Sequence, residues 1–170
     1  MACKALRSFF TVLIPSYRLN ISNLLDLCNR AETGHLAGVL AMGMRTIFQY
    51  PPNYVAIRKA FDLRGAKPIF AYGDVIFNPH KCLITPALRA HEEVHSARQG
   101  DDPAGWWKQY IASKEFRLAE ELPAHVVEWQ TLGGTEEQLD FIAGRLAAPI
   151  YGPMVSKPHA LELLRAANGR

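Results

Sequence analysis

The chain has 170 residues, of which 49% are hydrophobic and 21% charged, and its net charge is +3. This length suits one domain with a real core, and the composition excludes a disordered chain. The net charge is too small to predict a nucleic-acid partner. Residues 1–67 carry nine Lys or Arg against three Asp or Glu, which favours a solvated basic face over a basic arm that binds an acidic surface. Cys3, Cys28 and Cys82 match no zinc pattern and predict free thiols in a reducing compartment.

The beginning of the chain is apolar without forming a convincing export signal. Lys4 and Arg7 precede an apolar stretch at residues 9–14, but that stretch is minimal and no small-residue cleavage site follows it. Residues 36–48 form an apolar run that is too short to span a bilayer. We therefore expect no transmembrane span, and a cytoplasmic or virion-associated location.

A change of composition suggests how the chain is organised. Residues 20–48 have helical character, and the prolines that follow Tyr50 mark a turn. We expect residues 1–50 to form a helical arm, appended to the domain or part of it, that could bind a protein partner. Residues 51–170 would form the main domain.

The elements expected in that domain are a hairpin and several helices. Residues 69–72 and 75–77 predict two strands joined by Gly73-Asp74. Helix start and stop signals then recur along the chain. Two helices are expected over residues 55–63 and 86–99. A third begins after the N-cap Asp102, and a fourth begins after Ser113 or Lys114 and ends at residues 131–134. The last two run from the capping box Thr135–Gln138 to about Ala147, and over residues 158–167 after Ser156.

The helix expected at residues 86–99 carries the pattern His-Glu-x-x-His, from His91 to His95. Positions i and i+4 lie on one face of a helix, so both imidazoles can reach one metal ion. Glu92 flanks that ion, where it can take a proton from a water molecule. A buried histidine is more often a hydrogen-bonded core residue than a ligand, but two at this spacing with a glutamate between them favour a metal site.

The later helix supplies a carboxylate for the same site. At 100° per residue, one stripe of it holds Leu118, Glu121, Leu122, His125 and Trp129. Glu121 therefore lies on the apolar face, where a carboxylate needs a partner, and a zinc ion fits that need. The alternative partner is Arg117, one turn earlier. Glu120 points about the opposite way and is predicted to be a solvated surface charge.

The His-Glu-x-x-His motif followed by Glu121-x-x-Ala124 resembles the zincin metallopeptidases whose third zinc ligand is a glutamate on a later helix. The resemblance covers residues 68–129. It implies that His91, His95 and Glu121 hold one zinc ion per chain, with the glutamate of the motif as general base. It also implies that the strand before the motif lines the cleft, where a peptide or protein substrate can add to its edge.

The chain departs from this pattern at His125, where many such zincins have an aspartate that orients a ligand histidine. A hydrolytic mechanism also needs a donor for the oxyanion beyond the metal. Tyr110, Arg117, Tyr151 and His125 are candidates, and His125 is favoured as the catalytic donor because it shares the stripe with Glu121.

The sequence thus predicts an α+β fold that is mostly α, with a zincin-like core and a small hairpin before the metal-binding helix. The first functional hypothesis is a zinc-dependent hydrolase, a metallopeptidase in which a water molecule activated by Glu92 attacks an amide carbonyl. The alternative is a non-catalytic interaction protein, such as a phage-particle component, that keeps the core for structure. A third reading is a metal-free helical domain in which the motif is accidental.

Overall fold

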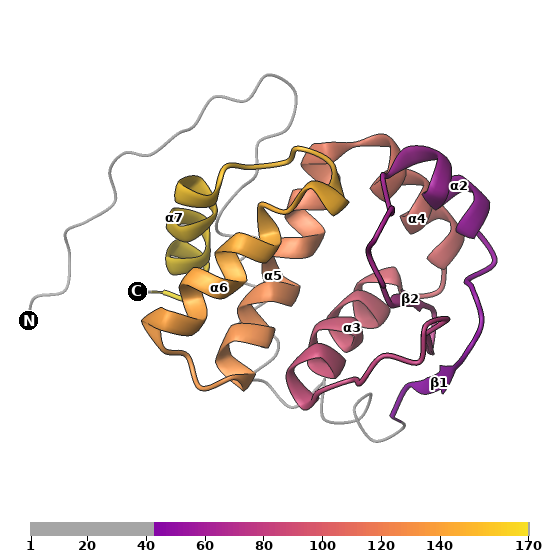
Figure 1. Cartoon of the computed structure of the whole chain (residues 1–170), viewed down its shortest axis with the longest axis horizontal. Helices are drawn as coiled ribbons and strands as arrows, with labels where there is room; N and C mark the ends of the chain where they lie inside the picture. Colours follow the sequence, from indigo (N-terminus) through magenta and orange to yellow (C-terminus); the bar gives the residue numbers. More distant parts are fainter. Residues whose placement is uncertain (1–42, 170) are drawn as a thin grey trace, which may run out of the picture. The chain divides into compact units, whose positions relative to one another are not determined.

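The computed structural model describes residues 43–169, so most of the predicted N-terminal arm lies outside the described residues. The described part is an α+β fold and mostly helical (Figure 1). Its elements are β1 (Arg45–Ile47), α2 (Tyr54–Ala60), β2 (Phe70–Tyr72), β3 (Val75–Phe77), α3 (Pro86–Gln99), α4 (Pro103–Ala112), α5 (Lys114–Thr131), α6 (Glu136–Leu146), the 3₁₀ helix η1 (Pro149–Tyr151) and α7 (Lys157–Ala167). Within residues 43–169, the helices lack the length and apolarity needed to cross a membrane.

The sheet has three strands in the order β1-β3-β2. The predicted hairpin is confirmed: β2 and β3 are antiparallel, and Gly73 takes a φ of 58° in the turn. β1 adds to β3 in parallel, with Arg45 opposite Val75. The helical prediction for residues 20–48 is therefore wrong at residues 45–47, which belong to the same sheet as the hairpin.

The helix boundaries follow the capping signals of the sequence. Helix α3 has the predicted bounds, and the Thr85 hydroxyl accepts a hydrogen bond from the Leu88 amide at 3.2 Å. Ser113 caps α5 in the same way, and Thr135 with Gln138 forms the predicted capping box of α6. Helix α2 ends earlier than predicted, at Ala60, because Phe61 is already extended.

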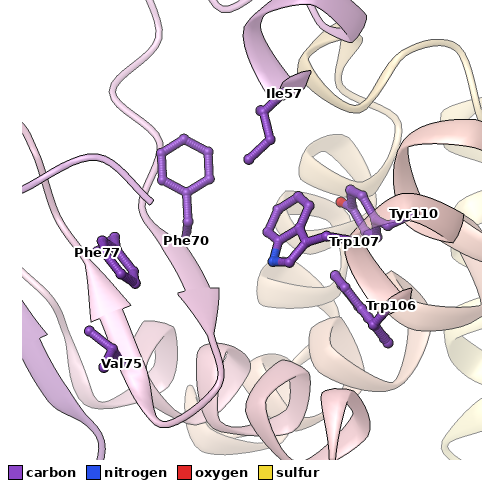
Figure 2. Close-up of a cluster of buried hydrophobic side chains, with 7 residues drawn as sticks. All are labelled: Ile57, Phe70, Val75, Phe77, Trp106, Trp107 and Tyr110. Carbon is purple, nitrogen blue, oxygen red and sulfur yellow. The ribbon is translucent and has the colours of Figure 1, made fainter. Parts of the chain in front are cut away.

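Helix α5 is central to the described part, with α3 and α4 packed on one side of it and α6 and α7 on the other (Figure 1). A cluster of aromatic and aliphatic side chains joins α2, the hairpin and α4 (Figure 2). Its buried members are Ile57, Phe70, Val75, Phe77, Trp106, Trp107 and Tyr110. This aromatic cluster packs the hairpin against α2 and α4, and Trp106 and Trp107 both belong to it.

Two side chains tie the hairpin to the helices. The Gln99 amide nitrogen donates to the Ala71 carbonyl at 2.9 Å, and its amide oxygen accepts from the Gly73 N–H at 2.7 Å. The Trp107 indole N–H also donates to the Ala71 carbonyl, at 3.0 Å. β3, the strand that precedes α3, is paired with β1 on one side and β2 on the other, so the expectation that a substrate adds to the edge of this strand is wrong. The Ala71 carbonyl of the edge strand β2 already accepts two hydrogen bonds, so it is not free to pair with an added strand either.

We predict that Gln99→Leu lowers the free energy of unfolding by about 1–3 kcal/mol, because it leaves the Gly73 N–H without its acceptor. Chemical denaturation measures this loss. Gln130→Leu is the matched control, because Gln130 is exposed and, within residues 43–169, its side-chain amide bonds to Asn168 alone. Equal losses for the two variants would show that Gln99 does not hold the hairpin.

Candidate metal centre

His91 and His95 lie one turn apart on α3, and both imidazoles are buried. Their Nε2 atoms face one another at 3.1 Å. The structure therefore brings the two histidines of the motif together on one face, as the i,i+4 spacing predicts. Two neutral imidazoles cannot both aim lone pairs at each other across this distance without a proton or cation between them.

Glu121 reaches the same point from α5. Its Oε2 atom lies 3.6 Å from His91 Nε2, and its Oε1 atom lies 3.4 Å from His95 Nε2. Around a tetrahedral ion with bonds of about 2.0–2.1 Å, neighbouring ligand atoms are about 3.3 Å apart. The two histidine nitrogens, and each nitrogen with its nearer oxygen of Glu121, lie close to this separation. One ligand atom from each of the three residues lies within 4.8 Å of the others, so His91, His95 and Glu121 could hold a metal ion.

The alternative partner for Glu121 is not used. The Arg117 guanidinium instead donates to the backbone carbonyls of Tyr151 at 2.9 Å and Tyr110 at 2.6 Å. The Tyr110 hydroxyl donates to Glu121 Oε1 at 2.5 Å. Glu121 Oε2 has no hydrogen-bond donor among the described residues, although it is fully buried. A buried carboxylate oxygen without a partner is costly, and a cation at this point would remove that cost.

The protonation states of His91 and Glu121 suit metal binding, whereas that of His95 opposes it. Burial lowers the pKa of His95, but Glu121 and the neighbouring carboxylates together raise it more, so this imidazole must release a proton when a metal ion binds. Burial lowers the pKa of His91 to about 4, so its imidazole is neutral at pH 7. Burial alone would raise the pKa of Glu121, but the facing His95, His91 and His125 hold it well below its usual range. Glu121 is therefore an anion and His91 keeps a lone pair, which are the forms that bind a metal ion.

Glu128 is a residue of the candidate site that the sequence analysis missed. Its Oε2 atom lies 3.1 Å from Nδ1 of both His91 and His125, and its Oε1 atom accepts a hydrogen bond from Arg145. The carboxylate is an acceptor, so the proton of His91 belongs on Nδ1 and the lone pair of Nε2 faces the metal position. Glu128 thus accepts a hydrogen bond from His91, although the sequence analysis identified no acidic residue for this contact.

The sequence did contain a signal for Glu128. Seven residues separate it from Glu121, which is about two helical turns, so the two carboxylates share a face of α5. At 100° per residue, Glu128 falls about 20° outside the predicted stripe, next to Glu121. A slightly wider stripe would therefore have included it as a second buried acid.

His125 lies between the two carboxylates. It is fully buried, with Nε2 3.5 Å from Glu121 Oε2 and its ring against that of His91. Its Nε2 atom has no hydrogen-bond partner among the described residues. His125 contacts the candidate ligands but does not line the cavity described below. Its predicted role as oxyanion donor stays a prediction.

Glu120 contradicts the sequence analysis, because it is buried and not a solvated surface charge. Its carboxylate accepts hydrogen bonds from the Arg98 guanidinium at 2.6 and 2.7 Å and from the Trp106 indole N–H at 2.9 Å. The prediction failed because α5 is covered on two sides. Glu120 faces α3 and α4, while Glu121 faces the histidines.

A cavity of about 350 Å³ opens beside these residues. His91, Glu92, His95 and Glu121 form one part of its wall. Glu92 is buried and makes no hydrogen bond to the described residues, and burial raises its pKa to about 7. The arrangement therefore places a carboxylate with a near-neutral pKa next to a site that could hold a metal ion, on a surface that a small molecule can reach.

No protein-family model, curated protein or solved structure matches this chain. Its function is therefore inferred from the geometry of the site.

We predict that Glu128→Gln weakens binding of Zn²⁺ by about 10–100-fold, because the amide holds the Nδ1–H of His91 less firmly than a carboxylate does. Competition with a chromophoric chelator measures this affinity. Glu137→Gln, at an exposed position of α6, is the control and should bind as wild type. Unchanged affinity in Glu128→Gln, in protein that is folded by circular dichroism, would show that Glu128 does not orient a ligand.

Proposed function

We propose that the protein is a zinc-dependent hydrolase, specifically a metallopeptidase of the zincin type. The observation that supports this most is that His91, His95 and Glu121 converge at tetrahedral separations in the wall of a cavity that also contains Glu92. Two imidazoles and one carboxylate are a common ligand set of catalytic zinc sites, which leave one position for water or substrate.

Zinc is the metal that this ligand set favours, because imidazole suits zinc and a purely oxygen-based magnesium or calcium site needs no histidine. One ion per chain is expected. When bound, zinc would act as a Lewis acid on a water molecule and on the substrate carbonyl.

Glu92 would be the general base. Its carboxylate lies in the cavity wall, next to His91 in the chain and close enough to His95 and Glu121 for their charges to act on its pKa. Burial favours the protonated form of Glu92, whereas a bound zinc ion would favour the carboxylate. This carboxylate would accept a proton from the attacking water and return it to the leaving amine. The buried carboxylate makes no other hydrogen bond to residues 43–169 that would prevent this.

We propose Tyr151 as a candidate oxyanion donor in addition to His125. Of the four candidates, Arg117 bonds to backbone carbonyls and Tyr110 donates to Glu121. His125 has its Nδ1 atom committed to Glu128. Tyr151 lines the cavity, and its hydroxyl makes no hydrogen bond to the described part of the chain. A free phenol is a donor that can meet a developing negative charge.

We predict that protein purified without chelators contains about one zinc ion per chain, and that Glu121→Gln lowers the zinc content severalfold because it removes the anionic ligand. Elemental analysis with protein quantification measures this ratio. Glu115→Gln, an exposed position on the same helix, should retain wild-type zinc. A wild-type protein that neither contains nor takes up zinc would contradict the proposal.

We predict that Glu92→Gln reduces peptide hydrolysis by at least about 100-fold, because the general base is lost while the zinc ligands remain. Cleavage of a fluorogenic peptide mixture and of casein measures the rate, and zinc content is measured on the same sample. Glu93→Gln is the matched control, because this neighbouring glutamate does not line the cavity. Undiminished cleavage by Glu92→Gln would exclude Glu92 as the base. A wild type that binds zinc but cuts no substrate would favour the structural alternative.

A further inference from the structure

We propose that the cavity beside the metal centre is a binding pocket for a bulky, uncharged apolar side chain, so that the substrate is a peptide with such a residue next to the reacting bond. The inference rests on the proposed function for the reaction itself. The apolar part of the pocket, however, consists of residues distinct from the candidate ligands.

The walls away from the ligands come from the aromatic cluster. Ile57 of α2 and Phe70 of β2 face Trp107 of α4, with Trp106 and Tyr110 next to it (Figure 2). All five also line the cavity. Part of the apolar surface of the cluster therefore faces the cavity, where a ligand can cover it.

The indole and phenol groups of this wall are already bonded elsewhere. The Trp107 N–H donates to the Ala71 carbonyl, the Trp106 N–H to Glu120 and the Tyr110 hydroxyl to Glu121. These aromatic residues therefore present carbon surface to the cavity and have no polar hydrogen left for a substrate. A polar or charged side chain that entered here would lose its hydration without gaining a partner.

The charged residues around the cavity lead to the same conclusion. Glu92 and Glu121 belong to the metal centre, and Arg145 is paired with Glu128. Among the described residues, this leaves Lys67 as the lining charge outside that group, and it is exposed. The interior of the apolar wall thus holds no charge that could neutralise a charged substrate side chain.

The size of the cavity limits what it can take. A volume of about 350 Å³ is near the lower end for ligand pockets, which suits one large side chain with adjoining backbone. Leucine, methionine, phenylalanine and similar side chains fit this chemistry and size. The pocket would thereby select the position of the bond relative to the metal ligands and Glu92.

Binding to zinc-loaded, full-length protein tests the selectivity. The probes are the hydroxamates of phenylalanine, leucine, lysine and glutamic acid, which share one zinc-binding group, and calorimetry measures their affinities. We expect the phenylalanine and leucine compounds to bind at least about tenfold more tightly than the two charged ones. Equal or tighter binding of lysine or glutamic acid hydroxamate would overturn the proposal.

A second measurement does not depend on zinc. Toluene is added to metal-free, ¹⁵N-labelled protein, and the indole N–H signals of the three tryptophans are followed by NMR. The signals of Trp106 and Trp107 should shift, while that of Trp129, which donates to the Thr135 carbonyl and does not line the cavity, should not. Unshifted signals of Trp106 and Trp107 would overturn the pocket.

Two variants and one control complete the test. Leu63→Glu and Ile150→Glu each place a carboxylate in a half-buried wall position, from different segments of the chain, and should weaken toluene binding at least fivefold. Leu83→Glu makes the same change at a position that is 85% exposed and outside the cavity, and should bind as wild type. Unweakened binding by both cavity variants overturns the proposal. Toluene binding without hydroxamate binding would support the pocket and contradict the zinc hydrolase.

Discussion

The Glu128 carboxylate is the interaction on which the geometry of the centre depends. One of its oxygens lies 3.1 Å from Nδ1 of His91 on α3 and of His125 on α5, and the other accepts from Arg145 of α6. A single buried anion therefore holds three helices in a fixed relation. It also fixes which nitrogen of His91 carries the proton, and so directs the lone pair of Nε2 toward Glu121. Without this acceptor the rings could rotate, and the tetrahedral separations would be lost.

Buried charge in this region is balanced locally. Glu121 faces histidines, Glu128 pairs with Arg145, and Glu120 pairs with Arg98. Helix α5 carries all three carboxylates, so its burial is tolerated only because α3 and α6 supply the matching groups. One atom, Oε2 of Glu121, has no hydrogen-bond donor within residues 43–169. Two buried ring nitrogens, Nδ1 of His95 and Nε2 of His125, also lack a partner there. The unpaired atoms of this region therefore cluster around the point where a metal ion could be held.

Much of the fold could be predicted because its signals are local. Thr85, Ser113 and Thr135 begin helices through hydrogen bonds to nearby amides, and Gly73 permits the hairpin turn. The meeting of His91 and His95 could be predicted because residues at i and i+4 share a face of any helix. What failed depends on contacts between distant segments. Residues 45–47 become a strand only because β3 is available to pair with them. Glu120 is buried only because Arg98, 22 residues earlier, meets it.

The open face of the centre distinguishes a catalytic site from a structural one. A metal site that serves only stability is closed by four protein ligands and packed on all sides. Here a cavity of about 350 Å³ reaches the three residues that could hold a metal ion. Glu92 lies in the same wall, buried and without a hydrogen-bond partner among the described residues, although a glutamine or leucine there would cost less to bury. A cavity and an unpaired acid both reduce stability, so neither is explained by folding. Both would be explained if a substrate bound in the cavity and Glu92 took a proton from water and passed it to the leaving amine. For this reason we favour hydrolysis over a structural role.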